Sequence, residues 1–477
     1  MNKLYLEWET IPEEEYLIKR SNFGAINSIL KIWRDEDYQL HFSIEMSQND
    51  FLNSKNKLYD RTKSLKLIGI QVIPNKRIFI RNLIITESKS TEYGTKYILL
   101  GIYTNSCHYI RPKIETSFYN VHFYLNSPNN FPFPENTAYE EKTLINYNIG
   151  RFSEDQFERN GKNSYSNNCL TLSINRKEIA LVSVKNQNTK GMYLRSKMGE
   201  SVSEAEAELV RNVFSFLTST KLVYLGSAEI HNDFSKHKNF QISSFESGIK
   251  RFIDKSEAFF PFPHSHFSYR AENYDTNATI QIFLDNYQRL KTEFLLDTVF
   301  YLIQNSRNSD FSLQIQPLAA AYDIIKKCWF KSNLSKSKGK YLDDIDFGTV
   351  LKDILPTLEN KLKNAKYSTA ILNRIKNANE ITSSQKDSFF FDEIGLAYGD
   401  IEKFAWQSRN LVVHGAISNN TNKIIFMNMS YQTLINRIIL HLLGIKEYID
   451  YTTNRRIIRN TTEMMMGLNE DGKIPTF

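Results

Sequence analysis

Apolar and polar residues alternate with a period of two through roughly the first 275 residues, as they do in strands that bury one face. Short polar turns separate these runs, and β-branched and aromatic residues are abundant within them. We therefore predict a β-sandwich or a curved antiparallel sheet. The expected strands are Lys66–Ile73, Arg77–Thr86, Thr95–Thr104, Ser117–Leu125, Leu170–Ile174 and Glu178–Lys185.

One helix is expected to interrupt the strands, from Ser203 to about Ser219. Ser203 is a good N-cap, and acidic residues follow it where the helix dipole favours them. The apolar residues of this run share one face, so we expect the helix to pack on a sheet. They are Leu209, Val213, Phe216 and Leu217.

Helical periodicity replaces the alternation after about residue 285, and most of the 11 prolines come before residue 265. The sequence thus predicts an α+β multidomain chain. We expect a β-rich region over residues 1–280, with room for two subdomains, an all-α bundle over 286–460 and a C-terminal tail over 461–477. The apolar stripes of five helices fall within Phe294–Ile303, Ile315–Trp329, Val350–Leu362, Ile394–Val412 and Leu434–Leu443.

Composition narrows the class of protein only modestly. Hydrophobic residues make up 41% and charged residues 24%, as in soluble globular proteins, and the net charge of +7 permits nucleic-acid binding without requiring it. The three cysteines lie far apart and match no zinc or disulfide spacing, so we expect no metal or other cofactor. Without an apolar leader or a long apolar run, the expected location is the cytoplasm, away from membranes.

The main candidate catalytic residues lie in one short segment, Arg409-Asn410-Leu411-Val412-Val413-His414. Arginine can neutralise a phosphate through its planar guanidinium, and histidine can transfer a proton near pH 7. Together they supply what phosphodiester cleavage without a metal requires. The plainer interpretation is a surface arginine and a histidine that ends a helix just before Gly415.

This segment resembles the signature of the HEPN superfamily, and the layout of the chain is similar to that of the ApeA-like anti-phage proteins within it. The resemblance implies an endoribonuclease of phage defence, with transfer RNA as one candidate target and a phage-encoded product as a candidate trigger. It also implies a homodimer that pairs its motif helices about a two-fold axis. Asp323 is the candidate for an acidic residue expected early in the helical domain.

RNA carries its own nucleophile, the 2′-hydroxyl beside each phosphate. We expect His414 to act as general acid or base, Arg409 to stabilise the charge of the phosphorane, and Asn410 to bind a phosphate oxygen or orient the imidazole. On a regular helix Arg409 and His414 point about 140° apart. A distorted helix end, the long arginine stem or a second subunit would have to bring them together.

Further side chains have both a functional and a plainer interpretation. Glu402 is expected on the face of Arg409, where it would orient the guanidinium or be simply a solvated charge. Trp406 would stack on a base or belong to a core or interface. A basic stretch free of acidic residues is expected to form a mobile loop after a helix, which either contacts RNA phosphates or aids solubility. Its members are Lys326, Lys327, Lys331, Lys336, Lys338 and Lys340.

Two other hypotheses stay open. In one, the helical domain is catalytically silent and serves dimerisation or nucleotide binding, while the β-rich region acts as a ligand-binding sensor. In the other, the abundant aromatic residues belong to a carbohydrate-binding β-sandwich enzyme, which would need two paired carboxylates in a cleft.

Overall fold

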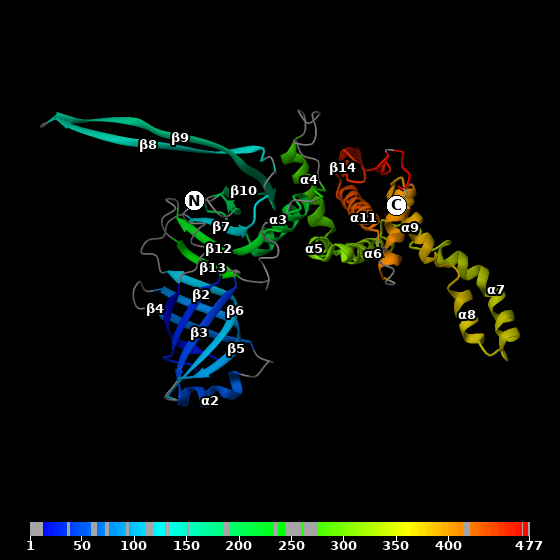
Figure 1. Cartoon of the computed structure of the whole chain (residues 1–477), viewed down its shortest axis with the longest axis horizontal. Helices are drawn as coiled ribbons and strands as arrows, with labels where there is room; N and C mark the ends of the chain where they lie inside the picture. The colour runs from blue at the N-terminus through cyan, green and yellow to red at the C-terminus, as the bar shows by residue number, and fades with distance from the viewer. Residues whose placement is uncertain are drawn as a thin grey trace. The chain divides into compact units, whose positions relative to one another are not determined.

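The computed structural model describes residues 13–35, 39–58, 64–71, 76–91, 95–110, 118–128, 131, 133–149, 152–185, 190–197, 199–231, 237–243, 259–261, 275–413, 420–469 and 471–475. The chain is α+β, with a β-rich N-terminal part and a mostly helical C-terminal part, as the sequence predicts (Figure 1). It forms two compact units. The first comprises Met1–Glu257 and Asn273–Gln281, and the second Ala258–Glu272 and Ile282–Phe477.

Six antiparallel strands begin the first unit and close on themselves as a barrel. The strand order is β3-β2-β1-β4-β5-β6, and β3 pairs with β6 from His41↔Ile102 to Ser47↔Lys96. Closure leaves no free edge in this part of the sheet. The strands are β1 (Glu14–Ser21), β2 (Ile29–Arg34), β3 (Leu40–Ser47), β4 (Leu65–Gln71), β5 (Lys76–Ser90) and β6 (Lys96–Ile110).

The sheet continues beyond the barrel because β6 is long enough to pair twice. Its first half contacts β3 and its second half contacts β13, which starts the series β13-β12-β7-β11-β10-β9-β8. One curved antiparallel sheet is thus present, as opposed to a sandwich. The remaining strands are β7 (Phe118–Leu125), β8 (Glu135–Ile149), β9 (Phe152–Ile174), β10 (Lys177–Lys185), β11 (Lys190–Ser196), β12 (Val223–His231) and β13 (His237–Ser243).

Two helices pack on this sheet. Helix α2 (Gln48–Leu58), which the sequence pattern did not reveal, stacks Phe51 on Tyr97 of the barrel with 4.0 Å between ring centroids. Helix α3 (Glu204–Leu217) confirms the prediction, because Ser203 caps it and Glu206 accepts a hydrogen bond from the Ser203 backbone.

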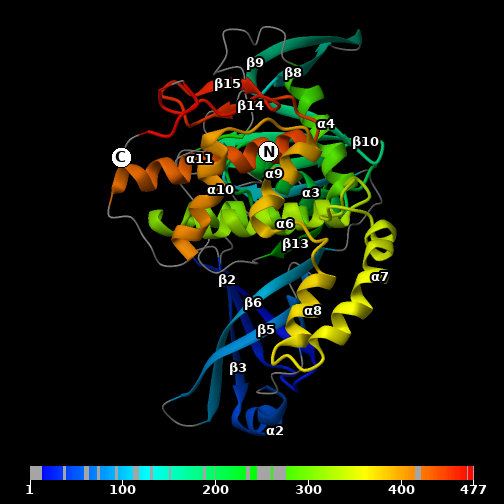
Figure 2. The same cartoon turned by 90° about the vertical axis from the view of Figure 1, so that its right-hand side faces the viewer.

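The second unit is built from helices (Figures 1 and 2). The innermost is α11, whose described side chains from Phe426 to Leu440 are nearly all buried. The elements are α4 (Thr276–Leu290), which begins in the first unit, α5 (Leu296–Asn308), η4 (Phe311–Leu313), α6 (Ile315–Lys331), α7 (Asp344–Leu362), α8 (Ser368–Lys376), α9 (Ser383–Ile394), α10 (Asp400–Val413), α11 (Thr421–Leu442), β14 (Glu447–Asp450) and β15 (Ile457–Asn460).

Three expectations for the helical part need correction. Helices outnumber the five expected, because the apolar stripes did not reveal α4, α8 and α9 as separate elements. The stripe Ile394–Val412 is two helices, since Gly395 adopts a left-handed conformation (φ 74°) and ends α9. The stripe on α7 is not a core stripe, because no residue of α7 is buried.

The segment after residue 460, expected as a tail, is in its described part packed against the helices. Thr461 and Met465 are buried, and the Met465 N–H donates to Glu402 Oε1 over 2.7 Å. Among the residues described, no helix has both the length and the apolar character that crossing a bilayer demands.

Candidate functional site

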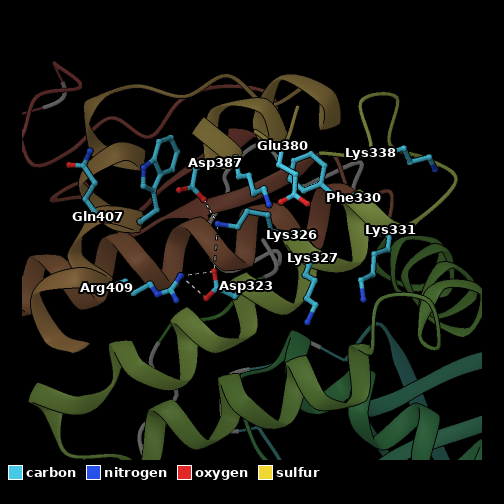
Figure 3. Close-up of a pocket in the computed structure, with 12 residues that line it drawn as sticks. Asp323, Lys326, Lys327, Phe330, Lys331, Lys338, Glu380, Asp387, Gln407 and Arg409 are labelled. Atoms are coloured by element: carbon cyan, nitrogen blue, oxygen red, sulfur yellow. Dashed lines mark hydrogen bonds and ion pairs between the residues drawn. The ribbon is translucent and has the colours of Figure 1, made fainter. Parts of the chain in front are cut away.

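A cavity of about 1220 Å³ opens between α6, the connection that follows it, α9 and α10 (Figure 3). Six basic and three acidic side chains contribute to its lining, so its charge is positive at neutral pH. Two aromatic side chains also line the cavity. The lining residues are Asp323, Lys326, Lys327, Phe330, Lys331, Lys338, Glu380, Lys386, Asp387, Trp406, Gln407 and Arg409.

Helix α6 supplies one whole wall because its residues divide between two faces. The apolar stripe from Ile315 to Trp329 packs into the core, as predicted. The neighbouring face carries polar side chains at spacings of three and four, which place them in line along the helix. They are Asp323, Lys326, Lys327 and Lys331, with the ring of Phe330 among them.

Arg409 and Asp323 form the central ion pair of the cavity. Nη1 of Arg409 lies 2.8 Å from Oδ1 and 2.6 Å from Oδ2 of Asp323. The side chains are 41% and 33% exposed, so both remain within reach of a ligand. Nη1 is the only nitrogen of this guanidinium with a partner among the described residues. Because the Arg409 side chain is 41% exposed, its guanidinium can also contact an anion in the cavity.

A second ion pair continues from the first. Nζ of Lys326 lies 3.5 Å from Oδ1 of Asp323 and also donates to Asp387 on α9. The Tyr322 hydroxyl donates to the same Asp387 oxygen over 2.8 Å. Burial, followed by the charge of Asp387, raises the pKa of Tyr322 well above its ordinary value. Tyr322 thus stays protonated and helps to fix the position of Asp387.

Trp406 lines the cavity from α10 and is half-buried. Its ring lies 5.3 Å from that of Phe391 and 5.6 Å from that of Tyr398, centroid to centroid. Trp406 therefore belongs to an aromatic cluster, as one of its two predicted interpretations has it, and also presents part of its surface to the cavity. Such a surface suits stacking on a base.

The basic stretch is not the mobile loop expected from the sequence. Lys326, Lys327 and Lys331 belong to α6, and the connection after the helix is held in place. Glu393 accepts from the Ser337 N–H and from Trp329 Nε1, each over 2.7 Å.

Glu393 is suited to this anchoring role by its charge. Burial by itself raises the pKa of Glu393, but hydrogen bonds from Ser337, Ser335 and Trp329 outweigh it and hold the pKa below its ordinary value.

Of the six predicted lysines, Lys326, Lys327, Lys331 and Lys338 line the cavity. Lys340 instead pairs with Asp344 over 2.6 Å, and Lys336 is exposed outside the lining.

Glu402 has neither of the roles predicted for it. It is fully buried, and its Oε1 lies 2.6 Å from Nη1 of Arg437, which is also fully buried. Arg437 further donates to the carbonyl oxygens of Thr461 and Ala397, over 2.6 and 2.7 Å. A buried guanidinium needs a counter-charge, and Glu402 supplies it in place of orienting Arg409.

Two of the predicted catalytic residues cannot be placed in the cavity by their side chains. His414, with Gly415, lies outside the described residues. Asn410 belongs to the last turn of α10, where the description of side chains ends at Arg409. Arg409 and Asp323, 86 residues apart in sequence, are brought together.

The sequence pattern did not single out Lys386 and Asp387 on α9, nor Glu380, Gln407 and Phe330. A signal for the α9 pair existed in the sequence Lys386-Asp387-Ser388-Phe389-Phe390, where two opposite charges precede an aromatic run. The aromatic run predicts a buried helix face, and the charges before it lie where that face meets a polar wall. The pattern does not reveal the partner of either charge.

No cluster of three or more potential metal ligands is found among the residues that the structure describes. Comparison with protein-family models, with curated proteins and with solved structures finds no match to the chain.

Proposed function

We propose that this chain is an endoribonuclease of the HEPN class that cleaves RNA without a metal ion. The observation that carries the proposal is the position of Arg409, half exposed in a positively charged cavity and bonded to Asp323 through one nitrogen. An arginine held at one end and open at the other can bind a phosphate without losing its orientation. The sequence places His414 five residues further on.

In the proposed reaction the 2′-hydroxyl oxygen attacks the adjacent phosphorus, and the bond from phosphorus to the 5′-oxygen breaks. One proton leaves the 2′-hydroxyl and another reaches the 5′-oxygen, so the products are a 2′,3′-cyclic phosphate and a 5′-hydroxyl. His414 would transfer one of these protons. Arg409 would stabilise the added negative charge of the phosphorane, where its effect is largest.

The lining lysines support RNA as the substrate. Lys327, Lys331 and Lys338 are exposed and line the same cavity as Arg409, where they would neutralise phosphates flanking the reacting one. Trp406, which is half-buried, offers ring surface to an unpaired base. Basic and aromatic groups in one groove are typical of single-strand binding.

We propose, from the family resemblance, that the first unit restrains the nuclease until a phage product appears. An unrestrained RNase would destroy the RNA of the cell that makes it. In cells that express the protein, RNA cleavage should therefore rise on phage infection, and Arg409→Ala should abolish that rise.

Purified protein incubated with total RNA in EDTA tests the activity. Wild type should produce fragments with cyclic phosphate ends, whereas Arg409→Ala and His414→Ala should not. Arg374→Ala, which removes an exposed arginine on α8, is the matched control and should cleave normally. Cleavage by folded His414→Ala would place the chemistry elsewhere and refute the proposal.

A second function is favoured by the cavity itself, whose volume lies just above the usual range of small-molecule sites and would hold a nucleotide. In that case the helical unit is catalytically silent and binds a nucleotide, with Arg409 and the lysines on its phosphates. Calorimetry would then show saturable nucleotide binding that Arg409→Ala weakens, and RNA would stay intact with wild type.

A further inference from the structure

Helices α7 and α8 form a hairpin that extends away from α6, α9, α10 and α11 (Figures 1 and 2). Its base is fixed. The Tyr341 N–H donates to the Asn379 carbonyl over 3.0 Å, and the Asn379 side chain bonds both the N–H and the carbonyl of Leu342 at 2.8 Å. The hairpin therefore starts from a defined position.

The hairpin buries little of its own surface. No residue of α7 or α8 is buried, and Pro356 interrupts the hydrogen bonds inside α7. Helices of this kind depend on tertiary packing. One side of α7 carries apolar residues that are half-buried. This degree of burial is what contact with a single neighbouring helix gives. The residues are Phe347, Leu351, Leu355, Leu358 and Leu362.

A second apolar strip on α7 has no cover among the described residues. Val350 is 53% exposed and Ile354 is 47% exposed. Asp346 and Lys361, both exposed, lie before and after them on the same side of the helix. The four residues fall within about 80° of helix circumference, because they are separated by four, four and seven positions.

In an antiparallel pair the two charged ends of the strip are complementary, while Asp353 and Thr357, both exposed, lie beside its apolar centre. If two copies of α7 pack antiparallel about an axis between residues 353 and 354, residue 346 of one copy faces residue 361 of the other. Asp346 then meets Lys361 of the second copy at both ends of the contact. The two Ile354 side chains meet near the axis, and each Val350 lies beside them. A two-fold contact of this kind is isologous and closed.

We propose that α7 is a docking surface for a second copy of this chain, centred on Val350 and Ile354 and aligned by two Asp346–Lys361 pairs. The contact lies on a different helix from the motif-helix pairing that the family resemblance implies. It also stands independently of the proposed nuclease activity.

Sedimentation velocity of the full chain over a concentration series tests this surface. Wild type should dimerise, and Val350→Glu/Ile354→Glu should raise the dimer dissociation constant at least about 30-fold, as disruption of the apolar centre of an interface does. The matched control is Ile345→Glu, which changes an 81% exposed residue on the opposite side of α7 and should leave the dissociation constant unchanged. Circular dichroism should show all three proteins folded.

Charge reversal tests the antiparallel alignment. Asp346→Lys and Lys361→Asp should each raise the dissociation constant about tenfold, because like charges then meet across the axis. The double variant Asp346→Lys/Lys361→Asp restores opposite charges and should dimerise nearly as wild type does. A monomeric wild type, or a dimer that tolerates Val350→Glu/Ile354→Glu, would overturn the proposal.

Discussion

The guanidinium of Arg409 rests between both carboxylate oxygens of Asp323, with Nη1 2.8 Å from one and 2.6 Å from the other. The two residues come from α10 and α6, so the pair links the helix of the Arg-Asn motif to the wall that carries the lysines. The ion pair sets the direction of Arg409, whose side chain lines the cavity and is 41% exposed.

Asp323→Asn should lower the RNA cleavage rate about 10- to 100-fold, because Arg409 loses its orienting charge while its position along the helix is unchanged. The apparent affinity for RNA should not fall, since one negative charge leaves the cavity. Single-turnover kinetics separate the two effects. Asp344→Asn, which changes an exposed carboxylate outside the cavity, should match wild type.

Lys327→Gln/Lys331→Gln should weaken RNA binding and flatten its dependence on salt. Removing one phosphate–lysine ion pair lowers the slope of log affinity against log salt by about 0.7 for a single strand. Fluorescence anisotropy at several salt concentrations measures the slope. Lys336→Gln removes a lysine that does not line the cavity, and a slope change in that variant would contradict a role for the cavity lysines.

Glu402→Gln should destabilise the second unit by roughly 3–5 kcal/mol, because it leaves the buried Arg437 without a counter-charge. Urea unfolding gives the free energy. Asp400→Asn, two residues earlier, removes an exposed charge 3.8 Å from Lys403 and should cost under about 1 kcal/mol. Equal destabilisation by the two substitutions would show that burial of the ion pair has no energetic weight.

Stability of the first unit should fall as the pH drops from about 6.5 to about 4. Burial lowers the pKa of His122 from 6.5 to about 4, despite a hydrogen bond to the Val202 carbonyl. Between these values the unfolded chain takes up a proton that the folded state cannot, and the total decrease in stability is roughly 3 kcal/mol. Below about pH 4 both states are protonated and the contribution stays constant.

Hydrogen exchange of β7, β11 and β12 across this pH range measures the effect locally. His122→Gln keeps a polar side chain in the same place but does not titrate. The difference between wild type and variant should therefore change with pH mainly between 4 and 6.5. Parallel pH profiles of the two proteins would argue against a neutral, buried His122.

Local patterns in the sequence predicted local structure well. Ser203 indicated the start of α3, and the runs on either side of residues 72–75 became the antiparallel pair β4 and β5. The stripe from Ile315 to Trp329 correctly predicted the buried face of α6. In each case the signal and the structure depend on residues close together in the chain.

The sequence pattern did not reveal the contacts between elements that lie far apart in the chain. Pairing of β3 with β6 closes the barrel, yet each strand alone has the same alternation in an open sheet. Glu402 shares a helix face with Arg409, but periodicity cannot show that Arg437, 35 residues later, takes its charge. The same limit hid the contact of Asp387 with Lys326, since one charge on a helix does not identify its partner.

The contacts of the buried Arg437 also bear on when α10 can pack while the chain is being synthesised. Its hydrogen-bond acceptors include Glu402, which precedes it, and Thr461, which follows it, while Met465 bonds the same Glu402. A growing chain that has just passed Arg409 therefore lacks the groups that hold α10 in place. We therefore expect α10 to reach its final packing only after the ribosome has added the segment beyond β15.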